Sequence, residues 1–209
     1  SSSSRGLGDV YKRQKMDLKT DKMIGEIKDG VGHLIFNNPE KRNATSLAMW
    51  QAAKTVLDSF ATDSSVKCLV VSGAGDKSFV SGADISEFEK ARSDAKAAAE
   101  YAHISSEGKE ALKNFPKPSI SMIQGYCLGG GMEVALSTDF RICSEDSQLG
   151  IPAARLSIAY SFDAIHRLYS LVGPSTAKDI LITARRIKAD EALQILSLIH
   201  ISEPTRRRT

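Results

Sequence analysis

Three consecutive glycines followed by a carboxylate form the stretch of the sequence that is best suited to chemistry. Gly129–Gly131 come shortly after the apolar run 118–124, and Glu133 follows two residues later. Glycines at a helix start have no Cβ, so unpaired backbone N–H groups there can approach a ligand oxygen closely. A glutamate in a first turn can also serve only to complement the helix dipole. The combination favours an active-site corner with Glu133 at its apolar edge.

A second glycine-containing loop also follows an apolar, strand-like run. Residues 79–85, Phe-Val-Ser-Gly-Ala-Asp-Ile, come after the run 68–72 and the turn 73–76. Both loops therefore lie at the C-terminal ends of predicted strands, where each can supply one N–H to a single oxygen. Two such donors are the arrangement that stabilises an enolate or another oxyanion.

Alternating strand-like and helix-like runs would position these loops. A hairpin is predicted from 22–27 and 32–36 around the Asp29-Gly30 turn, and Ser46 is predicted to cap a helix. The buried stripe of that helix is predicted from residues at helical spacing: Trp50, Ala53, Val56, Leu57 and Phe60. Further strands are expected at 66–72, 118–124 and 140–144, and helices at 94–115 and 130–137. The alternation predicts an α/β fold with mainly parallel pairing, and does not by itself separate a spiral from a doubly wound sheet.

Together with residues 36–44, Phe-Asn-Asn-Pro-Glu-Lys-Arg-Asn-Ala, the two loops resemble the enoyl-CoA hydratase/isomerase (crotonase) family. The motifs occur in the family's order, and the resemblance runs from about Ile24 to about Leu193, including 167–173. It implies a crotonase-like spiral of repeated β-β-α units and a coenzyme A thioester as substrate. It also implies an oxyanion hole formed by the N–H groups of Ala83 and Gly130.

The resemblance further implies which residues contact the substrate. Lys41 and Arg42 lie in a loop between a strand and a helix, where two cations can meet the phosphates of coenzyme A, although a solvated basic turn has the same composition. The family places coenzyme A near this segment and near the second loop. The predicted substrate contacts are Lys41, Arg42, Ala44, Ala83, Asp84, Ile85, Ser86 and Gly130. For Asp84 a helix cap is an equal alternative.

The implied mechanism converts the thioester into an enolate while Glu133 moves a proton or directs a water. The sequence departs from the hydratase pattern at one point, because the second glutamate of the family's hydratases is replaced here by Ala153. The following residues, 156–163, are bulkier than the glycine-rich run usual there. The predicted activity is therefore a lyase or isomerase of fatty acid metabolism, with Asp163 or Tyr160 as a substitute acid in the case of hydration. Thioester hydrolysis, decarboxylation and non-catalytic acyl-CoA binding are the alternatives.

Other function classes have weaker support. No GxGxxG, GxxxxGK[ST], GxSxG or HExxH pattern occurs in 15–195, which argues against a dehydrogenase, a P-loop protein, a serine hydrolase and a metalloprotease. Cys68, Cys127 and Cys143 form no CxxC pair and are predicted to be buried apolar residues. The histidines His33, His103 and His166 also lack ligand spacing. We therefore predict no metal and no cofactor, since coenzyme A is part of the substrate.

The two ends of the chain have a hidden relation. Residues 4–14 and 196–206 can be encoded by the two complementary strands of one DNA, which resembles a transposase-type sequencing adapter. Ranges 1–14 and 196–209 are accordingly interpreted as adapter-derived scars, for which no fold is predicted, and 15–195 as one C-terminally truncated acyl-CoA-binding catalytic domain. The scars hold six of the 28 bases and two of the 25 acids, so the domain has 22 bases, 23 acids and a net charge of −1.

That charge gives no support to a nucleic-acid or membrane partner. No run reaches the roughly 20 apolar residues of a membrane span, and Met16 is a plausible start without a signal peptide, which predicts a cytoplasmic protein. Members of the family assemble through C-terminal helices that would follow Ile195. We therefore expect the C-terminal helical region to be truncated here and the full-length parent to be a homotrimer or hexamer.

Overall fold

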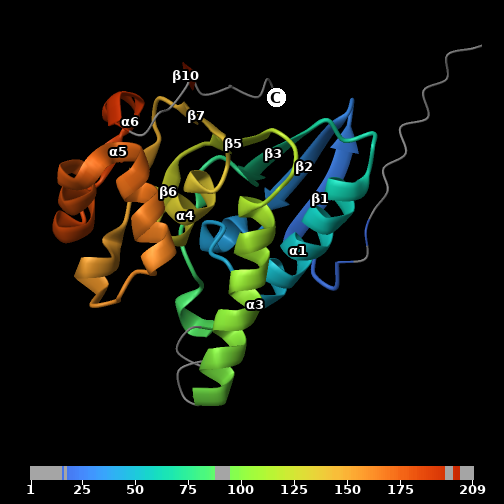
Figure 1. Ribbon diagram of the computed structural model, residues 1–209, viewed down its shortest axis with the longest axis horizontal. Helices are drawn as coiled ribbons and strands as arrows, with labels where there is room; N and C mark the ends of the chain where they lie inside the picture. The colour runs from blue at the N-terminus through green and yellow to red at the C-terminus, as the bar shows by residue number, and fades with distance from the viewer. Residues whose placement is uncertain (1–15, 17, 88–94, 196–199, 203–209) are drawn as a thin grey trace, which may run out of the picture.

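The computed structural model describes residue 16 and the ranges 18–87, 95–195 and 200–202. One sheet contains β1 (Met23–Lys28), β2 (Val31–Phe36), β3 (Cys68–Gly73), β5 (Ser119–Ile123), β7 (Phe140–Ser144) and β10 (His200–Ser202). A second sheet contains β4 (Ser78–Val80), β6 (Tyr126–Leu128), β8 (Gln148–Gly150) and β9 (Ile187–Lys188). The helices are α1 (Leu47–Thr62), α3 (Ala95–Lys113), α4 (Gly130–Leu136), α5 (Phe162–Thr183) and α6 (Ala189–Ile195), with short 3₁₀ turns η1 (Pro39–Lys41) and η2 (Pro152–Leu156). Figure 1 shows their arrangement.

The chain repeats one unit, in which a strand of the first sheet is followed by a short strand of the second sheet and then by a helix. The repeats are β3-β4-α3, β5-β6-α4 and β7-β8-α5. Neighbouring strands from successive repeats pair in parallel in both sheets. This is a spiral of β-β-α units, as the resemblance implied. The short strands β4, β6 and β8 were not predicted from the sequence.

The hairpin and first helix agree with their sequence signals. β1 and β2 pair antiparallel, and Asp29 and Gly30 between them both have positive φ, 52° and 79°, as a tight hairpin turn requires. Ser46 caps α1, because its side-chain oxygen accepts from the Met49 N–H at 3.3 Å. All five residues of the predicted stripe are buried. Helix α3 packs on α1 so closely that a Cβ on Gly108 would lie 2.8 Å from the Trp50 carbonyl oxygen.

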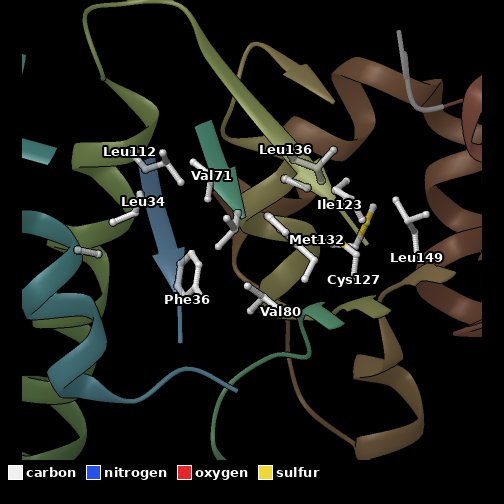
Figure 2. Packing of buried hydrophobic residues seen from close by; sticks show 14 of the residues in the cluster. Leu34, Phe36, Val71, Val80, Leu112, Ile123, Cys127, Met132, Leu136 and Leu149 are labelled. Atoms are coloured by element: carbon white, nitrogen blue, oxygen red, sulfur yellow. The ribbon is translucent and has the colours of Figure 1, made fainter. Parts of the chain in front are cut away.

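The hydrophobic core lies between the strands and the helices and fixes the orientation of α4. Met132 and Leu136, four residues apart and therefore on one helical face, are both buried in it. Figure 2 shows them beside Ile123 of β5 and Cys127 of β6. Glu133 is rotated by about 100° from Met132 around the helix, so its side chain leaves the core face.

Strand β10 lies in the range 196–209, which was interpreted as an adapter-derived scar and for which no structure was predicted. His200–Ser202 pair in parallel with Ile142–Ser144 of β7. In the described residues β7 would otherwise be an edge strand, and an edge presents unpaired N–H and C=O groups to any extended segment. The pairing does not test whether 196–209 derive from an adapter, so that origin stays a prediction.

Helix α5 was not predicted in detail and is interrupted in its middle. Gly173 has non-helical angles, φ 75° and ψ 169°, and Pro174 follows it, so two helical segments meet at a kink.

Within the described residues, no helix combines the length and the apolar character needed to cross a membrane.

Candidate active site

The two glycine-containing loops lie against each other. Strands β4 and β6 are parallel neighbours, so the loops that follow them leave the same edge of the second sheet. A Cβ built on Gly130 would lie 3.5 Å from Gly82 Cα and 3.9 Å from Ala83 N. The structure therefore brings Ala83 and Gly130, the two predicted oxyanion donors, next to each other.

The N–H groups of Ala83 and Gly130 have no hydrogen-bond acceptor among the described residues. Thr45 N–H donates to the Gly82 carbonyl at 2.8 Å, and the Asp84 N–H donates to the Thr45 carbonyl at 2.9 Å. Because successive N–H groups of an extended segment alternate in direction, the Ala83 N–H points away from Thr45. Gly130 begins α4, where the first N–H groups have no acceptor within the helix.

The three glycines of the triplet differ in how strongly backbone conformation and packing require a residue without a Cβ. Gly129 has φ 53° and ψ −115°, a conformation that residues with a Cβ rarely adopt. Gly131 packs against β4, and a Cβ there would lie 2.0 Å from the Val80 carbonyl oxygen. At Gly130 a Cβ would make only ordinary van der Waals contacts with Gly82 and Ala83, so packing alone does not require a glycine there.

Glu133 lies in the first turn of α4, as predicted, but its carboxylate has a partner that sequence reasoning missed. Lys109 Nζ of α3 lies 2.9 Å from Glu133 Oε2, and the side chains are 30% and 15% exposed. The ammonium also lies 5.7 Å from the centroid of the Trp50 ring. The contact could not be predicted from local sequence, because Lys109 and Glu133 belong to different helices. The carboxylate thus combines an apolar edge with one fixed cation.

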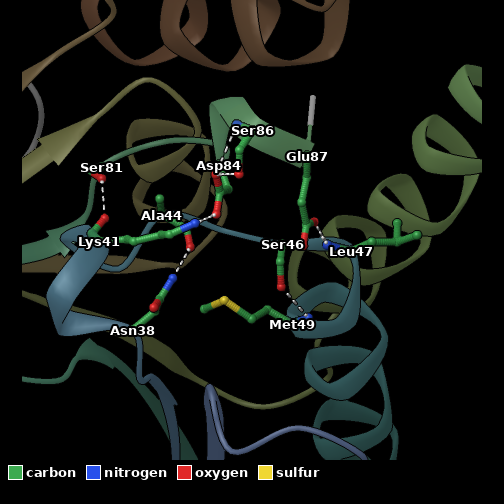
Figure 3. A network of polar contacts seen from close by, with 10 residues as sticks. All are labelled: Asn38, Lys41, Ala44, Ser46, Leu47, Met49, Ser81, Asp84, Ser86 and Glu87. Carbon is green, nitrogen blue, oxygen red and sulfur yellow. Dashed lines mark hydrogen bonds and ion pairs between the residues drawn. The ribbon is translucent and has the colours of Figure 1, made fainter. Parts of the chain in front are cut away.

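The loop that carries Lys41 and Arg42 is joined to the Ala83 loop, as Figure 3 shows. Lys41 Nζ lies 2.7 Å from Asp84 Oδ2, and Ser81 Oγ donates to the Lys41 carbonyl at 3.4 Å. Asp84 Oδ1 accepts from the Ser86 N–H at 3.0 Å and from Ser86 Oγ at 2.7 Å. Asp84 thus caps the short helical turn 85–87, which was the alternative role predicted for it.

The other predicted substrate contacts differ in their exposure and in their neighbours. The Arg42 guanidinium lies 5.4 Å from the centroid of the Tyr126 ring, on which Arg186 also stacks at 5.2 Å. The Ile85 side chain, two residues after Ala83, is 63% exposed. Asn38 Nδ2 donates to the Ala44 carbonyl at 3.1 Å, which fixes the backbone of the basic loop.

The Lys41–Asp84 pair makes stability depend on pH. Hydrogen bonds from Lys41 and then Ser86 hold the pKa of Asp84 below its usual range. A depressed folded pKa adds stability above the unfolded pKa of about 3.9, and this stability is lost as pH falls through the folded pKa. Asp84→Asn should therefore lower Tm at pH 7 by about 3 °C, and the difference should close as pH falls through the depressed pKa of Asp84. Calorimetry across pH checks this. Asp58→Asn, an exposed partner of Lys54, should change Tm little, and an equal loss in both variants would contradict the assignment.

The segment around Ala153, where the resemblance implies that a second glutamate is replaced, adjoins the glycine loop. A Cβ on Gly129 would lie 3.9 Å from Pro152 Cδ, and Ala153 follows in η2, packed against the core. Of the two substitute acids, Asp163 is exposed in the first turn of α5. Tyr160 Oη instead donates to the Gly129 carbonyl at 2.7 Å. Burial raises the pKa of Tyr160 far above its usual range, and the charge of Glu133 raises it further.

The cysteines show no sign of reactivity in the described residues. Cys127 and Cys143 are buried, and Cys68 is partly exposed. Burial raises the pKa of Cys143 to about 11 and raises that of Cys127 further. Within the described ranges, no group of three or more His, Cys, Asp and Glu side chains is placed to hold a metal ion.

Comparison with known proteins places this geometry in context. A model of the enoyl-CoA hydratase/isomerase family matches residues 26–196. The short-chain-enoyl-CoA hydratase of Clostridium acetobutylicum is 34% identical over 188 residues, which are 90% of this chain and 71% of that protein. The crotonyl-CoA hydratase of Syntrophomonas wolfei is 34% identical over 184 residues, which are 88% of this chain and 70% of that protein.

Solved structures of proteins described as enoyl-CoA hydratases or related proteins are similar to this chain in fold. An enoyl-CoA hydratase/carnithine racemase from Magnetospirillum magneticum matches with a TM-score of 0.84 and 28% identity, covering 88% of this chain and 69% of that chain. DspI from Pseudomonas aeruginosa matches with a TM-score of 0.83 and 30% identity, covering 89% of this chain and 70% of that chain. These likenesses confirm the predicted fold.

Proposed function

The chain belongs to the enoyl-CoA hydratase/isomerase (crotonase) family, which acts on acyl-CoA thioesters, and we propose that it is an enoyl-CoA hydratase or isomerase. In this proposal the thioester oxygen accepts from the N–H groups of Ala83 and Gly130, and Glu133 handles the proton. The proposal rests on the close approach of the two residues: a Cβ built on Gly130 would lie 3.9 Å from Ala83 N. Neither N–H donates to an acceptor in the described residues.

The chemistry requires the carbonyl oxygen to gain negative charge as the enolate forms. Two preorganised backbone donors stabilise that charge without reorganisation, and one such donor is worth about 3 to 4 kcal/mol in the barrier. Glu133, 15% exposed, then either takes a proton from the acyl chain and returns it elsewhere or directs a water onto the double bond. Only one carboxylate is available at the two family positions, because the second is Ala153.

Substrate binding is proposed to use the joined basic and Ala83 loops. Lys41 and Arg42 are exposed and cationic, so they suit the phosphates of coenzyme A. The Lys41 ammonium would then contact both a phosphate and the Asp84 carboxylate. Ala44, Ile85 and Ser86 border the same loops. No separate cofactor is proposed. A cytoplasmic location and a trimeric or hexameric parent stay predictions.

The absorbance of conjugated enoyl-thioesters tests the function. A hydratase removes the absorbance of a 2-enoyl-CoA, because water adds across the conjugated double bond. An isomerase creates the absorbance from a 3-enoyl-CoA, because the double bond moves into conjugation. If neither changes while acyl-CoA still binds, the second candidate, a non-catalytic acyl-CoA-binding protein, replaces the proposal. Release of free thiol or CO₂ would instead indicate thioester hydrolysis or decarboxylation.

Lys109 should matter for turnover through its contact with Glu133. Lys109→Met removes the ammonium that holds Oε2, so the carboxylate loses its fixed position, and kcat should fall about tenfold with KM within threefold. Steady-state kinetics on the responsive enoyl-CoA measure this. Lys113→Met, one turn along α3 and paired with Glu110 at 3.5 Å, is the matched control and should leave kcat unchanged. Equal kinetics for both variants would exclude the role of Lys109.

A further inference from the structure

One side chain holds the glycine loop from the side opposite to the proposed substrate. Tyr160 Oη lies 2.7 Å from the carbonyl oxygen of Gly129. A carbonyl oxygen can only accept, so the phenol proton lies in this bond. Tyr160 is packed against the core, which gives the hydroxyl a fixed position.

The bond acts on the proposed oxyanion donor because the Gly129 oxygen and the Gly130 N–H belong to one peptide unit. The unit is trans, since the described residues contain no cis peptide, so its oxygen and its hydrogen point in opposite directions. Glycine stands on both sides of it, and rotation of a peptide plane is least restricted between two glycines. Whatever holds the oxygen therefore sets where the N–H points.

Two other bonds also restrain the loop. The Glu133 N–H donates to the same Gly129 oxygen at 3.3 Å, which is longer than the Tyr160 bond. The Gly129 N–H donates to the Gly150 carbonyl at 2.9 Å, which holds the preceding peptide unit. A hydrogen bond accepted at a carbonyl also polarises its peptide and strengthens the N–H as a donor.

We propose that Tyr160 is a positioning residue that aims and polarises the Gly130 N–H toward the thioester oxygen, an inference that rests on the proposed function. It gives Tyr160 a role distinct from that of a substitute acid, because the hydroxyl proton is directed to the Gly129 carbonyl. It also explains how a flexible pair of glycines holds a donor at a defined angle.

Tyr160→Phe removes only the hydroxyl and keeps the ring that packs on the core. We expect kcat to fall about tenfold, with KM within twofold and Tm within a few degrees of the parent. Tyr169→Phe, on α5 with a half-exposed side chain, is the control and should change neither constant. If the hydroxyl only stabilised the fold, Tyr160→Phe would lower Tm and leave kcat per folded molecule unchanged.

Vibrational spectroscopy tests the donor without turnover. The carbonyl stretch of butyryl-CoA labelled with ¹³C at C1 should move to lower wavenumber on binding, because the two N–H groups polarise the carbonyl. In Tyr160→Phe this shift should be smaller, and in Tyr169→Phe it should equal that of the parent. An undiminished shift or an unchanged kcat in Tyr160→Phe would overturn the inference. Failure of the proposed function looks different, because the unsubstituted protein would then turn over no enoyl-CoA.

Discussion

Glu133→Gln should lower turnover of an enoyl-CoA by about 10²- to 10⁴-fold, the usual contribution of a positioned acid or base. The amide has nearly the same shape as the carboxylate and cannot take up a proton at neutral pH. Glu133 lies in α4 beside the buried core, so the loops that would bind coenzyme A are unaffected by the change. The affinity for acyl-CoA should therefore stay within a few-fold of the parent, and the loss should appear in kcat.

The control for this variant is Glu110→Gln, which removes a carboxylate from α3 that is paired with Lys113 at 3.5 Å. Its kcat should equal that of the parent. Absorbance assays give kcat, and calorimetric titration with butyryl-CoA gives affinity. If Glu133→Gln keeps more than half of the parent's turnover, Glu133 is not the acid or base.

The parts of the fold that could be predicted are those with local causes. The Asp29-Gly30 turn needs positive φ at both residues, and the Ser46 cap needs only the N–H of Met49, three residues away. The stripe of α1 follows from helical spacing alone. The relation between the glycine loops required more, because it depends on parallel pairing of β4 with β6, which was not predicted. The resemblance to a family supplied only the expectation that the N–H groups of Ala83 and Gly130 serve one oxygen.

Short strands and long-range partners could not be predicted. Strands β4, β6 and β8 have three residues each, too few for a period of two to show. Lys109 and Glu133 come from different helices, so their contact follows from how α3 and α4 pack on the core. The same holds for Tyr160, whose bond to Gly129 depends on the loop after η2. Long-range polar contacts of this kind leave little trace in one sequence.

The largest effect on stability is expected from Gly131→Ala. The new Cβ would lie 2.0 Å from the Val80 carbonyl oxygen and 2.8 Å from the Val80 carbonyl carbon. Both are backbone atoms of a buried strand, so relief requires α4 to move away from β4. Overpacking of this kind costs about 3 kcal/mol, which lowers Tm by roughly 6–12 °C in a domain of this size. Thermal unfolding followed by circular dichroism measures the loss.

Gly130→Ala is the matched control and should separate folding from function. Its Cβ would meet Gly82 Cα at 3.5 Å and Ala83 N at 3.9 Å, which are ordinary contacts, and alanine favours the start of a helix. Tm should therefore stay within a few degrees of the parent. The methyl would nevertheless stand beside both proposed donors and hinder the thioester oxygen, so turnover should fall by about tenfold or more. A lower Tm for Gly130→Ala than for Gly131→Ala would contradict this division. Gly130 and Gly131 cannot be distinguished by residue type. Comparing the two alanine variants separates the glycine that is needed for packing from the glycine that is needed for ligand binding.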